Sequence, residues 1–324
     1  MRPARLLAAV TRPARLSAVR RAWLLAAALL AATAVLVAGP STFVYEPAAV
    51  PPPRIPPITA TTPIPRQKPT PTFTPPPAFT TTQREALTQS LRDYLDDRPG
   101  SLSLSVRDLS TGLSYSYGKG VRTATASIVK VDIVMSLLLK AQRRNRPLTS
   151  TEKGLAERAI TLSDNGAATA LWHAIGGATG LAAANEKLGL RDTDPGPGGA
   201  WGSTTTSAAD QIRLLTALIS PESPLGPGAR RYVRHLMRDV APDQAWGVSA
   251  AGTEAEVKNG WLPRDVHGGR WTVNSIGIVR DSGHRYLIAA LSERNPTMQD
   301  GVDVIEHTTK AVTKALARAA ATER

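Results

Sequence analysis

Apolar and polar positions alternate in patterns that predict regular elements from about residue 82 onward. From Thr82 to Asp97, leucines recur at intervals of four, which predicts an amphipathic helix. Two alternating stretches, 102–106 and 113–117, flank a Ser-Thr-Gly turn at 110–112 and predict a β-hairpin.

The middle of the chain has a helical pattern, and its last part has a pattern of strands followed by a helix. Residues 126–142 are apolar almost all round, which is typical of a buried helix. Helices are expected up to about Met237, interrupted by the Gly/Pro-rich stretch 192–203. Three strand candidates precede a closing helix at 301–320: they are 254–258, 270–280 and 285–292. We therefore expect an α+β fold, with one antiparallel sheet built from both ends of region 81–324 and an inserted all-helical lobe.

The N-terminal residues have the pattern of a membrane-targeting segment. Residues 1–21 contain six arginines and no acidic residue, and residues 22–39 are apolar except for Thr33. This pattern predicts a basic cytoplasmic N-terminus, a single transmembrane signal anchor and an extracytoplasmic remainder. Pro40 argues against cleavage, so a signal peptide cleaved near residue 39, giving a secreted protein, is the alternative.

Proline dominates the next segment. Residues 40–80 hold 14 of the 26 prolines, which predicts an extended, disordered linker rather than a packed domain. Of the net charge of +13, residues 1–21 carry +6 and residues 40–80 carry +2, which leaves +5 for residues 81–324. This ordinary charge argues against a nucleic-acid partner. The chain has no cysteine, so disulfides, thiolate chemistry and lipidation on cysteine are excluded. We expect a monomer.

Ser127 and Lys130 are the first candidates for chemistry. Their i, i+3 spacing at the start of the buried helix places both side chains on one face. A serine hydroxyl needs a base to become a nucleophile, and a buried lysine can supply one. A capped helix with a snorkelling lysine gives the same pattern. A second match, Ser150 with Lys153, fits a helix N-terminus with exposed charges.

Two further triplets strengthen the catalytic interpretation. Ser-Asp-Asn lies at 163–165 in a turn between expected helices, and Lys-Asn-Gly lies at 258–260 at the end of an expected strand. Each has a structural alternative, a helix N-cap and a turn respectively. Together and in this order, the three elements resemble the Ser-x-x-Lys, Ser-Asp-Asn and Lys-Thr-Gly motifs of class A β-lactamases and penicillin-binding proteins. The resemblance covers about residues 83–320 and implies their fold.

The resemblance also implies catalytic roles. Ser127 would be the acylated nucleophile and Lys130 its activating neighbour. Ser163 would pass a proton to the leaving nitrogen, and Lys258 would supply positive charge for the substrate carboxylate. No metal or cofactor is implied. The five histidines show no motif spacing and are expected to be surface or packing residues: His173, His235, His267, His284 and His307.

Four residues are implied in substrate binding. Asn165 would hold the substrate's amide side chain, and Asn259 belongs to the third motif. Gly260 would leave room for the substrate beside the strand. The backbone N–H groups of Ser127 and Trp261 would form the oxyanion hole.

The sequence departs from the class A pattern in several places. No glutamate lies between Leu188 and Pro221, where class A enzymes have the glutamate that activates the deacylating water. Asp192 or Asp194 could replace it only if repositioned, so acylation is expected to be retained and fast β-lactam turnover is not.

Recognition of the substrate carboxylate is also altered. Asn259 replaces a hydroxyl residue, and Asn274 falls about where class A enzymes often have an arginine. Arg280 is a candidate replacement for that arginine. The segment between the first two motifs is short, which predicts a trimmed helical lobe.

The leading hypothesis is a membrane-anchored extracytoplasmic serine hydrolase acting on β-lactams or D-Ala-D-Ala-like cell-wall peptides. β-Lactam hydrolysis is favoured over peptidase activity because Ser-Asp-Asn is the class A form of the second motif. The alternative is a non-hydrolysing penicillin- or peptidoglycan-binding sensor. A Ser–Lys esterase is a third hypothesis.

Overall fold

The computed structural model describes residues 78–321. The expected cytoplasmic N-terminus, signal anchor and nearly all of the Pro-rich linker lie outside these residues. Within 78–321, no helix combines the length and apolar character needed to cross a membrane.

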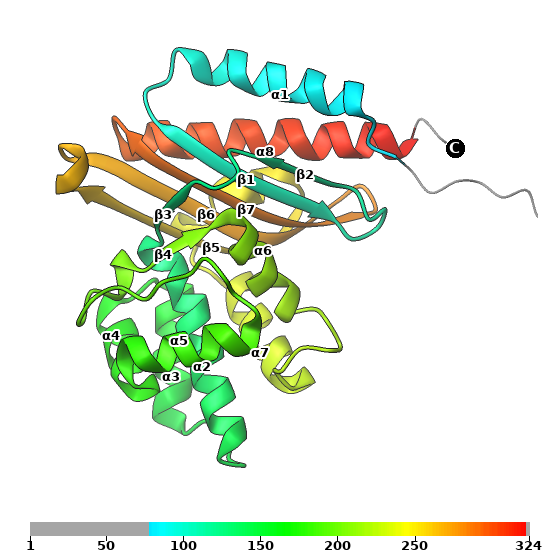
Figure 1. Cartoon of the computed structure of the whole chain (residues 1–324). Helices are drawn as coiled ribbons and strands as arrows, with labels where there is room; N and C mark the ends of the chain where they lie inside the picture. The colour runs from blue at the N-terminus through cyan, green and yellow to red at the C-terminus, as the bar shows by residue number, and fades with distance from the viewer. Residues whose placement is uncertain (1–77, 322–324) are drawn as a thin grey trace, which may run out of the picture. The chain divides into compact units, whose positions relative to one another are not determined.

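A five-stranded antiparallel sheet forms the centre of the fold (Figure 1). Its strand order is β2-β1-β7-β6-β5, so strands from the two ends of the region lie side by side. The strands are β1 (Ser101–Asp108), β2 (Ser114–Tyr117), β5 (Glu254–Arg264), β6 (Arg270–Asp281) and β7 (His284–Asn295). In the central pairing, β1 runs against β7 from Ser101↔Glu293 to Asp108↔Tyr286. The expected α+β fold with a sheet from both chain ends is confirmed.

Two helices, α1 (Thr81–Asp96) and α8 (Met298–Ala321), cover one face of this sheet (Figure 1). Leu87 and Leu91 of α1 are buried because their four-residue spacing places them on the same side of the helix. Thr80 starts α1 with a capping box, in which its side chain and that of Gln83 satisfy each other's backbone N–H groups.

A helical lobe packs on the opposite face, as the sequence pattern predicts. It comprises α2 (Val129–Arg143), α3 (Ser150–Thr161), α4 (Asn165–Ile175), α5 (Gly177–Leu188), α6 (Ala208–Ala217) and α7 (Pro227–Arg238). Helix α2 lies at its centre, where every residue from Val129 to Leu139 is buried. Short elements complete the fold: β3 (Arg122–Ala124), β4 (Thr205–Ser207) and the 3₁₀ turns η1 (Ala126–Ile128), η2 (Trp201–Ser203), η3 (Pro242–Gln244), η4 (Gly247–Ala251) and η5 (Asp265–His267).

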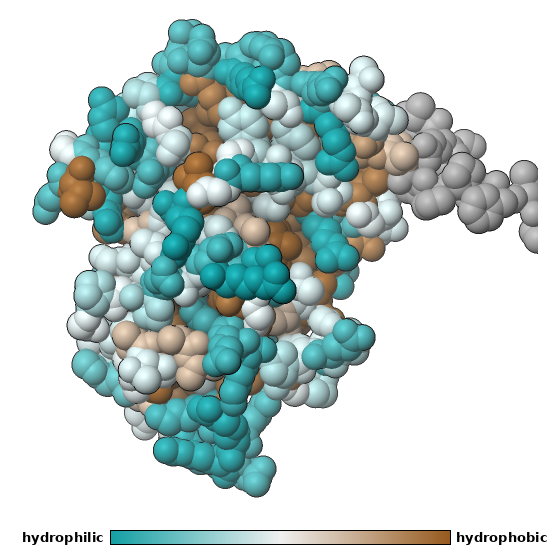
Figure 2. Space-filling view, viewed as in Figure 1, coloured by the Kyte–Doolittle hydropathy of each residue, from teal (hydrophilic) through white to brown (hydrophobic). Residues whose placement is uncertain are grey.

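Side chains on the two faces of the sheet pack into two separate hydrophobic cores. Ile276 and Leu287 face the helical lobe, whereas Val273 and Ile288 face α1 and α8. Hydrophilic side chains cover much of the outer surface of α1 and the far end of the helical lobe (Figure 2). The sheet therefore lies between the helical lobe and the layer of α1 and α8. A side chain between β5 and the helical lobe is consequently surrounded by protein.

The main difference from the expected elements is the length of β5. The sequence pattern predicts a strand that ends at Lys258, but β5 continues to Arg264 and pairs with β6 throughout. The Lys-Asn-Gly triplet consequently lies within a strand and not in a turn. Asn259 pairs with Ser275 of β6, and its side-chain amide donates to Gln244 O and Trp246 O.

Candidate active site

Ser127 lies in a tight turn between β3 and α2. The preceding residue, Ala126, has φ of +49°, a conformation that costs a non-glycine residue about 1–2 kcal/mol. The neighbouring Thr125 is fixed because its N–H donates to Thr204 O at 2.7 Å. Such strain persists only where the surroundings hold the backbone, so the Ser127 side chain has a defined direction.

Lys130 is completely buried one turn after Ser127. Its Nζ lies 2.9 Å from Ser127 Oγ, 2.6 Å from Ser163 O, 3.1 Å from Ser163 Oγ and 2.8 Å from Asn165 Oδ1. An ammonium group has three protons, so these four acceptors exceed what it can satisfy at once. Protein acceptors alone can thus satisfy all the hydrogen bonds that the Lys130 ammonium group can donate.

The Ser-Asp-Asn triplet forms the turn between α3 and α4. Ser163 has φ of +57°, which directs both its carbonyl and its hydroxyl toward Lys130. Asp164 caps α4 by accepting from Ala167 N at 2.9 Å, and it also pairs with Arg158 at 3.2 Å. Its carboxylate is therefore engaged at the helix start.

Lys258 completes the cluster from β5. It is fully buried, and its Nζ donates to Ser163 Oγ at 3.0 Å and to Asn259 O at 2.9 Å. The hydroxyl of Ser163 consequently lies between two lysine side chains. The structure brings together Ser127, Lys130, Ser163 and Lys258 in one continuous hydrogen-bonded chain.

The two lysines have unusual acid–base properties. Burial lowers the pKa of Lys130 to about 8, although the negative charge of Asp164 opposes this shift. Burial and the positive charge of Lys130 lower the pKa of Lys258 to about 7. Between residues 78 and 321, no carboxylate forms an ion pair with either group. Near neutral pH, the cluster can therefore release a proton and hold a free amine.

Gly260 allows β5 to pass directly against the turn that contains Ser127. A Cβ atom at this position would overlap Ser127 N, and it would lie 2.7 Å from Ile128 N and 3.0 Å from Thr125 O. All three are backbone atoms and cannot rotate away. The packing of β5 on the Ser127 turn therefore requires glycine here.

A cleft of about 360 Å³ opens beside Ser127. Residues of the loop 199–203 and of the last part of β5 line it. The lining residues are Ala126, Ser127, Asn165, Gly199, Ala200, Trp201, Gly202, Ser203, Trp261 and Leu262. Among the predicted binding residues, Asn165 and Trp261 thus line the cleft, whereas Gly260 packs against the Ser127 turn.

Two predicted contacts with substrate, Asn259 and Arg280, do not fit the structure. Asn259 is fully buried and its amide is committed to Gln244 O and Trp246 O, so its side chain is not free for substrate. Asn274 is also buried and donates to two carbonyl groups of the Ser127 turn. Arg280 lies opposite Glu254, four residue pairs along the strands from Lys258, and does not line the cleft.

Asp192 and Asp194 are likewise committed elsewhere. Asp192 accepts from Ser207 Oγ at 3.2 Å, and Asp194 forms an ion pair with Arg122 at 2.5 Å. Neither carboxylate lines the cleft. The substitution of one of them for the class A glutamate is therefore not supported by the geometry.

Trp201 is a site residue that the sequence patterns did not single out. Its ring centroid lies 5.0 Å from Lys130 Nζ, and its Nε1 donates to Thr169 Oγ1 at 3.1 Å. The only available signal was its position as the single aromatic residue of the Gly/Pro-rich stretch 192–203.

The five histidines lie away from the cleft, in line with the sequence-based expectation. His284, for example, contacts buried Asp108 through Nδ1 at 2.7 Å and does not line the cleft. Within residues 78–321, no group of three or more histidine or carboxylate side chains is placed to hold a metal ion.

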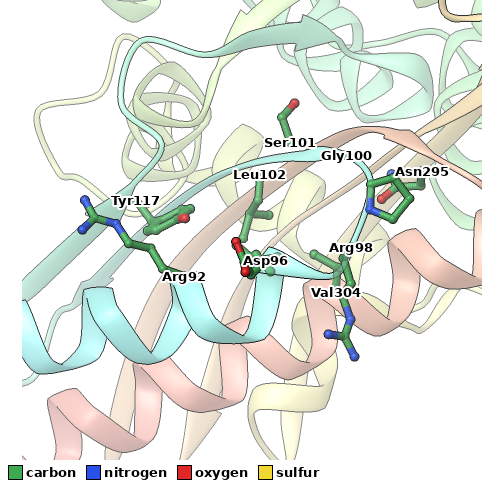
Figure 3. Close-up of a pocket in the computed structure, with 11 residues that line it drawn as sticks. Arg92, Asp96, Arg98, Gly100, Ser101, Leu102, Tyr117, Asn295 and Val304 are labelled. Atoms are coloured by element: carbon green, nitrogen blue, oxygen red, sulfur yellow. The ribbon is translucent and has the colours of Figure 1, made fainter.

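A larger cavity than this cleft lies elsewhere in residues 78–321 (Figure 3). It has a volume of about 540 Å³ and lies beside α1, with Arg92, Tyr117 and Asn295 among its lining residues. None of the four clustered serine and lysine side chains reaches it.

Comparison with known proteins identifies the family. Residues 142–316 match the family model described as the beta-lactamase enzyme family. The chain belongs to the beta-lactamase enzyme family. The matched range includes the second and third motifs and begins after Ser127 and Lys130.

Solved structures of serine β-lactamases and penicillin-binding proteins share the fold of this beta-lactamase family member. TLA-1 extended-spectrum β-lactamase has a TM-score of 0.65 at 16% identity, over 72% of this chain and 99% of its own. A class A β-lactamase from Bacteroides cellulosilyticus has a TM-score of 0.63 at 17% identity, over 74% and 100%. A mutant of PBP-A in an acyl-enzyme complex with penicillin G has a TM-score of 0.62 at 21% identity, over 75% and 99%. The expected superfamily is confirmed.

Curated relatives come from mycobacteria. The protein named "Putative lipoprotein LppW" of Mycobacterium tuberculosis is 30% identical over 199 residues, which are 58% of this chain and 62% of the relative. The same values hold for the Mycobacterium bovis protein of that name. The matched region thus spans less than two thirds of these relatives.

Proposed function

We propose that this protein is a serine acyl-transfer enzyme that forms a covalent adduct on Ser127 with β-lactams or D-Ala-D-Ala-like cell-wall peptides. The supporting observation is the hydrogen-bonded chain Ser127–Lys130–Ser163–Lys258 at the edge of a cleft. It supplies a nucleophile, a base and a proton relay without histidine, cysteine or metal.

Acylation would follow the order of this chain. Lys130, as a free amine, takes the proton of Ser127 Oγ while the oxygen bonds to the substrate's carbonyl carbon. Ser163 Oγ then passes a proton to the leaving nitrogen as the C–N bond breaks, and Lys130 replaces the proton lost by Ser163. The ester on Ser127 and the neutral amine product balance the step.

The developing oxyanion would be bound by the backbone. Ser127 N–H lies close to the start of α2, where backbone N–H groups are not used within the helix. Trp261 N–H would be the second donor, brought near by the passage of Gly260 against the turn. Asn165, which lines the cleft, would contact the substrate's amide side chain.

Carboxylate recognition would depend on the buried lysines. No arginine lines the cleft as the structure describes it. Lys258 and the hydroxyl of Ser163 would therefore supply the positive field and the donor that a substrate carboxylate needs. Binding of an anion would in turn favour the charged form of Lys258.

Release of the acyl group would be slow. Asp192 and Asp194 are committed elsewhere, and no carboxylate of the described residues contacts Ser127 or Lys130. We therefore infer an acyl-enzyme that persists, as in a penicillin-binding protein, and not rapid β-lactam turnover. A penicillin or peptidoglycan sensor is the second candidate function, and the same observation favours it.

The protein would work outside the cytoplasm at the membrane. The arginine-flanked apolar segment 22–39 supports a helical anchor, and the name of the curated mycobacterial relatives describes a lipoprotein. This chain has no cysteine for a lipid, so the anchor would be the apolar segment itself. Secretion after cleavage near residue 39 stays the alternative.

Labelling of the full-length protein with a fluorescent penicillin tests the proposed function. We expect a covalent adduct that survives gel electrophoresis and disappears in Ser127→Ala. Ser150→Ala is the matched control, because it removes the serine of the other Ser-x-x-Lys match, and its labelling should equal that of the wild type.

The outcomes separate the candidate functions. No adduct in the wild type would reject acylation by penicillin, and hydrolysis of small esters without labelling would identify a Ser–Lys esterase. A transient adduct with accumulating hydrolysed penicillin would identify a turning-over β-lactamase and contradict the slow step inferred above.

A further inference from the structure

The loop that carries Trp201 is fixed by a buried carboxylate on α6. Asp210 accepts from the N–H groups of Arg191 and Asp192 at 2.9 and 2.7 Å, and from Thr193 Oγ1 at 2.7 Å. Farther along, Gly196 N donates to Thr204 Oγ1 at 3.0 Å, and a bridge joins 194 to 205. These bonds hold both ends of the loop.

The indole of Trp201 is directed from this loop onto Lys130. The distance of 5.0 Å from the ring centroid to Lys130 Nζ is within the range of a cation–π contact. The bond from Nε1 to Thr169 Oγ1 on α4 fixes the ring from its far edge. The same ring forms part of the cleft wall beside Ser127.

Hydrolysis of an ester on Ser127 would require water and a base in this same place. Water adds to the acyl carbon, the C–Oγ bond breaks, and one proton returns to Ser127 while the other leaves with the acid product. Lys130 is the basic group nearest to Ser127 Oγ. Its other neighbours are Ser163, Asn165 and the indole, so water has no free approach to it.

We propose that Trp201 is a positioning residue that excludes water from Lys130 and thereby sets the lifetime of the acyl-enzyme. The inference rests on the proposed acylation of Ser127. During acylation, Lys130 acts as the base for Ser127, whose Oγ lies 2.9 Å from Lys130 Nζ. After acylation, Lys130 has no water beside it to activate. The indole takes the space in which a hydrolytic water would stand.

The acid–base state of Lys130 is consistent with this arrangement. Burial is the largest cause of its lowered pKa. A ring face interacts favourably with an ammonium group, but less well than the water that it displaces. Removal of the ring would therefore readmit water and raise the pKa of Lys130.

Acyl-enzyme lifetime, measured by the decay of the penicillin adduct after excess label is removed, tests the proposal. We expect Trp201→Ala to shorten the lifetime at least tenfold and to release hydrolysed penicillin. Trp201→Phe keeps a ring in place and should stay within threefold of the wild type. Thr169→Val frees the indole edge without removing it and should give a smaller shortening than Trp201→Ala.

A second measurement does not depend on acylation. In protein with ¹³C-labelled lysine, NMR titration should show a higher Lys130 pKa in Trp201→Ala than in wild type, by at least about half a unit. An unchanged pKa together with an unchanged lifetime, in a variant whose thermal unfolding is cooperative, would overturn the proposal. Absence of any adduct in the wild type would instead refute the proposed function, and the titration would still decide whether Trp201 shields Lys130.

Discussion

At the scale of single residues, the hydroxyl of Ser163 links the charge states of two lysines. It lies within 3.1 Å of both Lys130 Nζ and Lys258 Nζ. Two ammonium groups in such proximity repel each other, and this repulsion contributes to the lowered pKa of Lys258. The pair therefore titrates as a unit, and the first proton leaves near neutral pH.

This titration predicts the pH dependence of acylation. Lys130 must be a free amine to accept the Ser127 proton, and the pKa of Lys130 is about 8. The fraction of free amine rises with pH, so the limiting acylation rate at saturating penicillin should rise about tenfold per unit from pH 6 and level off above about 8. The rate is measured at each pH by stopping the penicillin-labelling reaction at successive times and quantifying the labelled protein.

Lys153→Met provides the control for this profile. Lys153 belongs to the exposed Ser-x-x-Lys match on α3 and makes no contact with the cluster. Its replacement should leave the profile unchanged. A rate that is flat or falls between pH 6 and 8 in the wild type would show that Lys130 is not the base.

At the scale of elements, the site depends on how closely β5 approaches the start of α2. Gly260 contacts the backbone of the Ser127 turn, and its partner across the sheet, Asn274, donates to Ala124 O and Thr125 O. The two residues hold the edge of the sheet against the Ser127 turn. The strand and the helix thus position Ser127 jointly.

Gly260→Ala should disrupt this junction. The added methyl group would meet backbone N–H groups that cannot move independently, so β5 must shift away from Ser127. We expect penicillin labelling to slow at least about 100-fold and the free energy of unfolding to fall by about 1–3 kcal/mol. Labelling rates and urea unfolding measure the two effects.

Gly154→Ala is the matched substitution. Gly154 lies in α3 with open space around its Cα, so alanine there should stabilise the helix by up to about 1 kcal/mol and leave labelling unchanged. If Gly260→Ala labels at the wild-type rate, the close approach of β5 has no part in positioning Ser127.

The sequence patterns predicted the elements well and the contacts between them less well. The strands and helices of the sheet layer were predicted because their apolar residues alternate or recur every four positions. Asn259 was assigned to substrate binding because its motif neighbours are, but the direction of its side chain depends on Gln244 and Trp246, which no local pattern reveals. Trp201 was missed for the same reason, since Asp210 on another helix holds its loop.

At the scale of the whole molecule, buried acids inside the helical lobe couple stability to pH. Asp132 of α2 is fully buried, and burial together with the charge of Asp210 raises its pKa to about 8. The carboxamide of Asn185 lies 2.8 Å from Asp132 Oδ2 and, depending on how it is turned, accepts from a protonated carboxyl or donates to an ionised one.

The raised pKa of Asp132 predicts a loss of stability with increasing pH. The folded state retains a proton that the unfolded state releases near its ordinary value of 3.8. Between pH 5 and 7, the free energy of unfolding should therefore fall by up to about 1.4 kcal/mol per pH unit from this group. Asp132→Asn should remove this slope, as measured by urea unfolding at each pH.

Asp265→Asn, at an exposed carboxylate of η5, is the control and should keep the wild-type slope. The lowered pKa values of Lys130 and Lys258 act mainly above pH 7, where they make stability rise with pH, so they do not mask the effect. Parallel pH curves for wild type and Asp132→Asn would show that Asp132 is ionised in the folded protein.

The pairing of β1 with β7 has a consequence for biogenesis. His284 and Asp108, in contact at the end of this pairing, are 176 residues apart in the sequence. During synthesis, the whole helical lobe, β5 and β6 are made before β7, so the first hairpin can pair with β7 only late. The sheet therefore cannot close until β7 has been synthesised. Folding becomes complete only when the last strand and α8 arrive, so the final part of the chain decides when Ser127 acquires its surroundings.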